Sequence, residues 1–152
     1  MTTQTQKSAL KTFIESCEAD IETNYVVGSF RQSSKDLIVY KKVCTGIPNP
    51  RGGQHMAIAT LKIKSFNPIF VSKLKCRTSS AEVISIEKIT SKNTLYKNRK
   101  RNAITKAYSI HDPKFVYEVG KEVVPTNQFS YNFDDCTYGI HFFFDLQDAL
   151  NY

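Results

Sequence analysis

Four side chains in the sequence are of types that do chemistry in enzymes and metal sites: Cys76, Arg77, Cys136 and His141. A thiol within hydrogen-bond reach of an imidazole is the minimum for nucleophilic catalysis. The same side chains also bind zinc. His141, however, lies inside the apolar run 140–144, where a histidine that is hydrogen-bonded within the core is the commoner case. Cys76, Cys136 and His141 are therefore weak candidates, and the sequence predicts no catalytic set, no metal site and no cofactor.

A second set of side chains is basic and lies in one polar stretch without periodicity, residues 90–106. Lysine and arginine contact phosphates and bases stack on aromatic rings, so a basic run around a tyrosine is typical of nucleic-acid binding. The alternative is a solvated loop that keeps a sheet edge soluble. The candidate nucleic-acid ligands are Lys92, Tyr96, Lys97, Arg99, Lys100, Arg101 and Lys106.

Charge is distributed unevenly along the chain, whose formal net charge is +7. Residues 62–106 contain twelve Lys or Arg and two Glu, whereas residues 107–152 contain two Lys and seven Asp or Glu. The first segment is strongly basic and the second is acidic. Each of these flanks could meet a partner of opposite charge.

Length and composition predict one globular domain, because 152 residues with 41% hydrophobic content can bury a core. The first residues contain no apolar signal region, and no apolar stretch reaches the roughly 18 residues of a membrane span. We therefore expect an intracellular protein that is neither secreted nor held in a membrane. Its four cysteines form no CxxC pair and are expected to be reduced thiols.

Two helices are predicted, one near each end of the sequence. Residues 8–22 place apolar side chains on one face at helical spacing, and this face could pack on a sheet or on a second copy of the protein. Asp145 is a suitable N-cap for a short second helix that contains Leu146, Ala149 and Leu150. The apolar face of the first helix consists of Leu10, Phe13, Ile14, Cys17 and Ile21.

Strands are predicted where β-branched and aromatic residues gather, at 37–43, 57–63, 81–86 and 115–125. The first two would form a hairpin around the Gly- and Pro-rich loop 46–53. The almost wholly apolar run 140–144 predicts a strand at the centre of a sheet. The expected class is α+β: a single domain with a mostly antiparallel sheet, an N-terminal amphipathic helix and a short C-terminal helix. Residues 1–36 would form the helix and its connection, and residues 37–152 the domain itself.

Residues from 37 to 152 contain a series of short blocks, among them Tyr40-Lys41-Lys42, Cys76-Arg77 and Gly139-Ile140-His141-Phe142-Phe143. Taken together, these blocks resemble an uncharacterised domain of bacteriophages and large DNA viruses that often sits beside pentapeptide repeats. The resemblance implies a viral or phage origin, with the host cytoplasm or the virion as location, and it supplies no catalytic residues. Two features depart from the family: Lys64 stands where Pro is usual, and no pentapeptide repeats are present. The matching residues are Tyr40-Lys41-Lys42, Leu61-Lys62-Ile63, Cys76-Arg77, Ala81, Val83, Ile86, Ser109, Asp112, Phe115, Tyr117, Val119, Gly120, Cys136, Gly139-Ile140-His141-Phe142-Phe143, Ala149 and Tyr152.

Three functions follow as hypotheses. The leading one is a small virus- or phage-encoded accessory protein that acts by binding another macromolecule, with a protein as the expected partner. The second is nucleic-acid binding through the basic loop 92–106, which would weaken steeply with salt. The third and weakest is an enzyme that depends on cysteine and histidine. Self-association through the helix at 8–22 is a further expectation.

Overall fold

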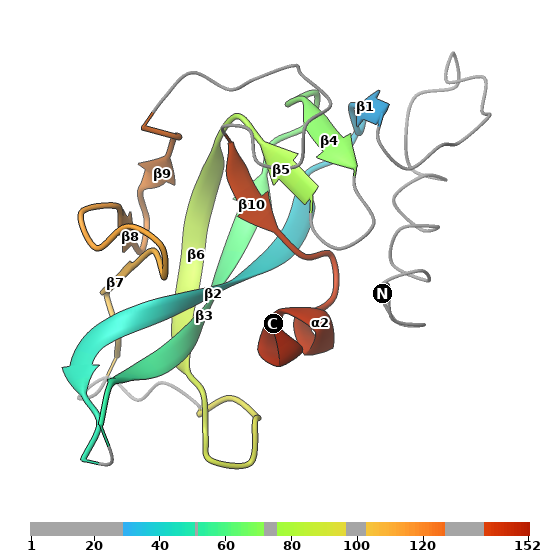
Figure 1. Cartoon of the computed structure of the whole chain (residues 1–152). Helices are drawn as coiled ribbons and strands as arrows, with labels where there is room; N and C mark the ends of the chain where they lie inside the picture. The colour runs from blue at the N-terminus through green and yellow to red at the C-terminus, as the bar shows by residue number, and fades with distance from the viewer. Residues whose placement is uncertain (1–28, 51, 72–75, 97–102, 127–138) are drawn as a thin grey trace.

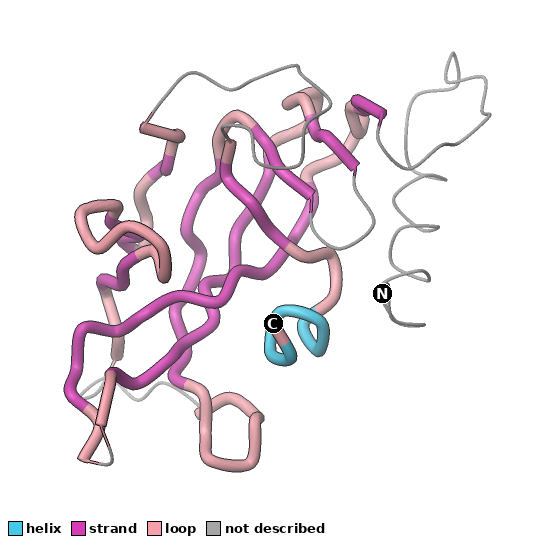
Figure 2. Tube along the Cα trace, viewed as in Figure 1, coloured by secondary structure: helices cyan, strands magenta, loops and turns pink. Residues whose placement is uncertain are grey.

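The computed structural model describes residues 29–50, 52–71, 76–96, 103–126 and 139–152, and strands dominate these ranges (Figures 1 and 2). The strands belong to two antiparallel sheets. The elements are β1 (Ser29–Arg31), β2 (Leu37–Pro48), β3 (Gln54–Ile63), β4 (Ile69–Val71), β5 (Cys76–Thr78), β6 (Ala81–Lys88), β7 (Lys106–Tyr108), β8 (Val116–Glu118), β9 (Glu122–Val123), β10 (Ile140–Phe142) and α2 (Leu146–Asn151).

The larger sheet is built on a long hairpin of β2 and β3, and its strand order is β8-β7-β2-β3-β6-β9. The hairpin prediction is confirmed, with Leu37 paired to Ile63 and Val43 to Ala57. The turn between these strands contains Gly52 and Gly53, both with positive φ. Glycine adopts this backbone conformation without the steric cost that a side chain adds.

The larger sheet curls because its two end strands, β8 and β9, are consecutive in the chain. β8 pairs with β7, and β9 pairs with β6. The turn between them is fixed on both sides: the Val119 N–H donates to the Thr105 carbonyl, and the Gly120 N–H donates to the Val83 carbonyl. Residues 116–123 therefore connect β7 to β6, and the sheet has a barrel-like curvature (Figure 1).

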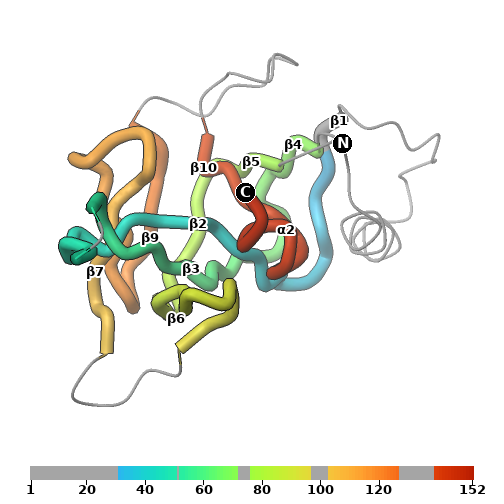
Figure 3. Tube along the Cα trace, turned by 60° about the horizontal axis from the view of Figure 1, so that its bottom comes forward, coloured from blue at the N-terminus to red at the C-terminus, as the bar shows by residue number. Residues whose placement is uncertain are grey.

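The smaller sheet has the order β1-β4-β5-β10. The main core lies on one face of the β2–β3 hairpin and includes residues of both sheets, such as Val39, Leu61, Ile69 and Phe142. A second cluster lies on the opposite face, where Ala149 and Leu150 of α2 pack against Ile58 and Phe143. In Figure 3, as in Figure 1, α2 lies beside β2. This helix therefore covers the hairpin face that the main core leaves open.

The predicted α+β class is wrong for the part of the chain that the structure describes. This part is mostly antiparallel strand, and its single helix is the six-residue α2. The predicted helix at 8–22 lies outside the described residues. Several of the strands have only two or three residues and leave little pattern in a sequence, so the sequence under-predicted strand in this part of the chain.

The strand predicted at the centre of a sheet is also placed differently. β10 lies at the end of the smaller sheet, beside β5. It is nevertheless buried, because Phe143 pairs with Tyr40 of β2 through two backbone hydrogen bonds of 2.9 and 2.8 Å. The apolar composition thus reflects packing between two sheets. Asp145 caps α2 as predicted, and its side chain accepts hydrogen bonds from the N–H groups of Gln147 and Asp148.

Candidate functional site

The candidate site lies where one edge of β2 changes partner. Tyr40 pairs with Phe143, which follows β10, and Cys44 pairs with Tyr108 of β7. In an antiparallel ladder, alternate residues direct their N–H and C=O groups toward the same edge. Lys42, midway between the two pairs, therefore directs its backbone polar groups toward the space between β10 and β7. A pocket forms at this break in the pairing.

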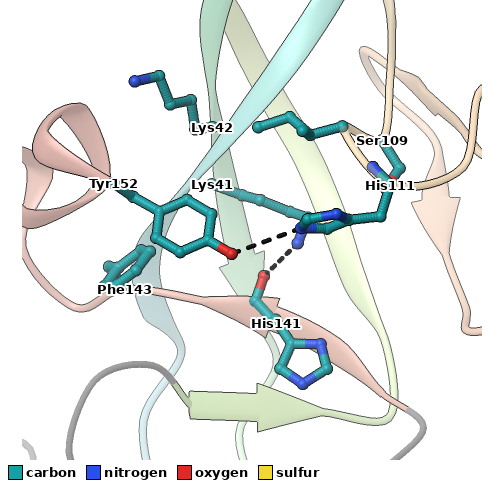
Figure 4. A pocket seen from close by; sticks show the side chains of 8 residues that line it. Lys41, Lys42, Ser109, His111, His141, Phe143 and Tyr152 are labelled. Carbon is teal, nitrogen blue, oxygen red and sulfur yellow. Dashed lines mark hydrogen bonds between the residues drawn. The ribbon is translucent and has the colours of Figure 1, made fainter. Parts of the chain in front are cut away.

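Lys41 and Lys42, at adjacent positions of β2, both line the pocket. Their side chains leave the strand on opposite faces, so the Lys41 ammonium group lies in the pocket and the Lys42 ammonium group is directed away from it, toward α2 (Figure 4). Lys41 Nζ donates a hydrogen bond of 2.9 Å to the carbonyl oxygen of His141. Lys42 Nζ donates one of 3.1 Å to the carbonyl oxygen of Leu150 in α2. Both side chains are half-buried. A carbonyl carries no net charge, so neither of these two bonds is an ion pair.

The opposite wall comes from the turn after β7 and from the end of α2. The His111 ring and the Tyr152 hydroxyl approach each other to 3.4 Å between Nε2 and the hydroxyl oxygen (Figure 4). The Tyr152 ring also packs beside Phe143, with ring centroids 5.4 Å apart. Ser109 orders the turn, because its hydroxyl accepts the His111 N–H at 3.3 Å. Segments that are distant in the sequence thus line the pocket together.

The pocket is small, cationic and partly open. Its volume is about 40 Å³, which corresponds to a few water molecules or one small anion. Among the described residues that line it, none is Asp or Glu. Asp112 is close in sequence, but its carboxylate accepts the Lys114 N–H in its own turn. We call this site the cationic pocket; its lining residues are Lys41, Lys42, Ser109, Ile110, His111, His141, Phe143 and Tyr152.

The cysteine and histidine candidates are not brought together. In the β5–β10 pair, Cys76 stands opposite Phe142, and Arg77 stands opposite His141. Neighbouring residues of a strand point to opposite faces, so the Cys76 thiol and the His141 imidazole lie on different faces of the sheet. Figure 4 shows the His141 ring directed toward β5, away from the cationic pocket, to which this residue contributes its carbonyl.

Cys76 and Arg77 are also too deeply buried to contact a reactant. Cys76 is fully buried, and Arg77 is only 2% exposed. The Arg77 guanidinium lies over the Phe70 ring, 4.5 Å from its centroid, in a cation–π contact. Cys136 lies outside the described residues. Within the described ranges, no group of three or more His, Cys, Asp or Glu residues is placed to hold a metal ion.

Of the basic-loop candidates, the structure describes Lys92, Tyr96 and Lys106, whereas Lys97, Arg99, Lys100 and Arg101 lie outside the described residues. Tyr96 is half exposed, and Lys88 Nζ lies 5.4 Å from its ring centroid. Lys106 forms an ion pair of 3.2 Å with Glu118. Hydrogen bonds from Lys121 and Lys106 lower the pKa of Glu118 below its ordinary value. Lys106 thus stabilises the pairing of β7 with β8 and is engaged with Glu118 rather than with Tyr96.

The hairpin turn that follows β6 meets the surface next to the cationic pocket. The side-chain amide of Asn93 donates a hydrogen bond of 3.1 Å to the Asn151 side chain. Asn151 is the neighbour of Tyr152, which forms part of the pocket wall. The exposed Lys92, next to Asn93, is therefore on the same part of the surface as the pocket.

Sequence reasoning missed the cationic pocket, although it had singled out many of its residues for another reason. Six of the eight lining residues carry the resemblance described above, and they come from separate blocks of the sequence. One signal was available: Lys41 stands between Val39 and Val43, at a position with the parity of the core. A lysine at such a position needs a polar partner.

The fold and the pocket define a small, mostly antiparallel β domain with a cationic site at a break in its sheet. The chain belongs to DUF5758, a family of unknown function, whose model matches residues 27–149. This range contains all the pocket residues except Tyr152. No curated protein and no solved structure matches the chain. Within the described part of the chain, no helix is long and apolar enough to cross a membrane.

Proposed function

We propose that this protein is a binding module that captures a partner protein by receiving an acidic group of that partner in the cationic pocket. One observation carries the proposal: the pocket is lined by two lysines whose ammonium groups are held by backbone carbonyls, and its described lining contains no Asp or Glu. Such a pocket attracts an anion, and fixed donors lose little conformational entropy when the anion binds.

Binding is favoured over catalysis because the pocket offers no activated nucleophile among its described lining residues. The Ser109 hydroxyl accepts the His111 backbone N–H at 3.3 Å and so orders the turn. A serine activated for attack also donates its proton to a neighbouring base, and Ser109 makes no such bond within the described part of the chain. The Cys76 thiol is fully buried in the core.

The resemblance to a domain of bacteriophages and large DNA viruses supports a viral or phage origin. On that basis the protein would act in the cytoplasm of the host cell or in the virion. The family match itself is to a family of unknown function and names no partner. The partner is therefore to be found by capture.

The test uses the tagged full chain as bait in a lysate of host or infected cells, with and without nuclease. Wild type is compared with Lys42→Met, which removes the charge of one lysine that lines the pocket. The matched control is Lys35→Met, because Lys35 is an exposed lysine in the turn before β2. Thermal unfolding establishes beforehand that each variant is folded.

We expect a protein that is captured regardless of nuclease, is lost with Lys42→Met and is retained with Lys35→Met. Capture that Lys42→Met leaves unchanged would contradict the role of the pocket. Recovery of nucleic acid alone would contradict a protein partner and would favour the second candidate below.

The second candidate is nucleic-acid binding by the hairpin turn and the basic loop. It is favoured by the half-exposed Tyr96 beside Lys88, since a base can stack on such a ring while a cation contacts phosphate. Binding to a single-stranded oligonucleotide should then fall steeply with salt. Changing Lys97, Arg99, Lys100 and Arg101 to Ser should reduce the salt slope by about one unit for each cation removed that contacts a phosphate. An unchanged slope would dismiss this candidate.

A further inference from the structure

We propose that the cationic pocket receives the C-terminal residue of the partner protein, so that the acidic group that enters it is the α-carboxylate at the end of a chain. This inference rests on the proposed function, in which an acidic group of a partner enters the same pocket. It adds which acidic group that is. The observation that carries it is a pair of backbone groups of Lys42 that the sheet leaves unbonded.

The pocket edge of β2 is paired on both sides of Lys42 but not at Lys42 itself. Tyr40 exchanges two backbone hydrogen bonds with Phe143, and Cys44 pairs with Tyr108. Lys42 has the same parity in β2, so its backbone N–H and C=O groups are directed toward the same edge. Within the described part of the chain, neither of these two groups makes a hydrogen bond. The pocket therefore presents one backbone donor and one backbone acceptor, and both need partners.

Neither neighbouring segment pairs with Lys42, because both turn away from β2 there. By the register of the residues around β10, the residue opposite Lys42 would be His141, whose carbonyl oxygen accepts from the Lys41 ammonium group instead. By the register of β7 it would be Ile110, which lies in the turn after that strand. Both residues line the pocket, so the space opposite Lys42 is bounded by the chain on two sides.

A C-terminal residue suits both backbone groups of Lys42. Its own N–H can donate to the Lys42 carbonyl, and its carboxylate can accept from the Lys42 N–H, as in a hydrogen-bonded pair of an antiparallel ladder. Backbone groups that capture a C-terminal carboxylate are a recurring mode of peptide recognition. An ionised Asp or Glu side chain has acceptors only, so it would leave the Lys42 carbonyl without a donor.

The surroundings of Lys42 favour a chain end over the interior of an extended segment. An internal residue also has an N–H and a C=O group, but its chain must continue in two directions. His141 and Ile110 bound the space on these two sides, whereas a chain end needs a single exit. A carboxylate also suits the lining, where the Lys41 ammonium group lies in the pocket and no described residue is Asp or Glu (Figure 4).

The test is an NMR titration of the full chain that follows the Lys42 backbone amide. The first probe is a short N-acetylated alanine peptide with a free C-terminal carboxylate. The second is the same peptide with a C-terminal amide, and the third is the amidated peptide with one internal Glu. The fourth has a free carboxylate and an N-methyl group on its last residue, which removes the N–H that would donate to the Lys42 carbonyl.

We expect the free-carboxylate peptide to bind saturably and to shift the Lys42 amide signal. Both amidated peptides should bind at least tenfold more weakly, since they lose a hydrogen bond to a charged group. The N-methylated peptide should bind about two- to tenfold more weakly, since it loses one neutral hydrogen bond. Lys41→Met should weaken the free-carboxylate peptide, whereas Lys35→Met should bind it like wild type. The comparison of probes uses wild type alone, so it stands even where a variant fails to fold.

Each other outcome overturns a defined part of the inference. Equal binding of the amidated Glu peptide would overturn the C-terminal carboxylate as the ligand. Equal binding of the N-methylated peptide would overturn the pairing with the Lys42 carbonyl. If no peptide binds while Lys42→Met still abolishes partner capture, the C-terminal inference fails and the proposed function stands. If capture survives Lys42→Met, the proposed function fails, whatever the titration shows.

Discussion

Removing the cap of α2 should destabilise the helix that carries one acceptor of the cationic pocket. Asp145 has an extended backbone, with φ −114° and ψ 134°, and its side chain accepts hydrogen bonds from the N–H groups of Gln147 and Asp148 at 2.9 and 3.2 Å. A helix of six residues has no stability of its own in water. Its position therefore depends on the cap and on the packing of Ala149 and Leu150 against the sheet.

Asp145→Ala removes both hydrogen bonds at once. An N-cap replaced by alanine costs about 1 kcal/mol, within a range of roughly 0.5–2 kcal/mol. The Gln147 N–H is exposed and can bond to water instead, whereas the bond to the Asp148 N–H is partly buried. We therefore expect a loss of about 1 kcal/mol in the free energy of unfolding. In a chain of this size, such a loss lowers the melting temperature by about 2–4 °C.

Asp145→Asn is the matched control, because asparagine caps helices as well as aspartate does. The assay is thermal and urea unfolding followed by circular dichroism, together with the capture experiment described above. We expect Asp145→Ala to lower both stability and partner capture, since Leu150 of α2 supplies the carbonyl that holds Lys42. If Asp145→Asn is as harmful as Asp145→Ala, negative charge rather than capping stabilises the helix and this reasoning is refuted.

Three further predictions concern the curled sheet. Burial raises the pKa of Tyr117 above its ordinary value, so the stability that its neutral form supports is present below about pH 10 and is lost at higher pH. Tyr117→Phe should therefore shift alkaline unfolding to higher pH. An unshifted midpoint would contradict a role of Tyr117 in alkaline unfolding. The pKa of Glu118 is lowered by its two lysine partners, so its contribution is present above about pH 4.3 and is lost as the pH falls. Glu118→Gln should flatten the dependence of unfolding on pH in the acid range, and an equally steep dependence in the variant would contradict the ion pairs. Gly46 has φ +78°, and an added Cβ would lie 3.1 Å from the Tyr108 side chain. Gly46→Ala should therefore lower the free energy of unfolding, measured in urea, by about 1–3 kcal/mol. An unchanged midpoint would show that the backbone around Gly46 relaxes.

Local features of this fold could be predicted from the sequence where the signal is carried by neighbouring residues. The hairpin of β2 and β3 is long, rich in β-branched residues and joined by a glycine-rich turn, and its strands and pairing were predicted. The cap at Asp145 depends on residues two and three positions away and was predicted as well. Strands such as β9 and β4, with two or three residues, exist because a neighbouring strand offers hydrogen bonds. A short stretch of sequence gives no information about the neighbouring strand with which these residues pair.

The position of β10 shows why composition alone misplaced a strand. Ile140 and Phe142 are almost fully buried, as the apolar run indicated. Packing covers these residues on different sides: Ile140 and Phe142 belong to the main core, and Phe143 belongs to the second cluster. The edges of the strand are paired with β5 and, at Phe143, with Tyr40 of β2. The sequence shows that a strand is buried, but the elements that bury it come from distant segments.

Lys41 shows how much of the site itself could be predicted from the sequence. In β2 the alternation of Val39, Lys41 and Val43 places a lysine at a position of core parity between two fully buried valines. A charge in that place requires a polar partner, so the pattern marks the residue as unusual. The partner is the carbonyl oxygen of His141, one hundred residues away, and the second lysine is held by Leu150. Neither acceptor is a side chain, so no residue type in the sequence identifies them. The position of the site could therefore have been suspected, but the backbone carbonyls that hold the two ammonium groups could not have been identified.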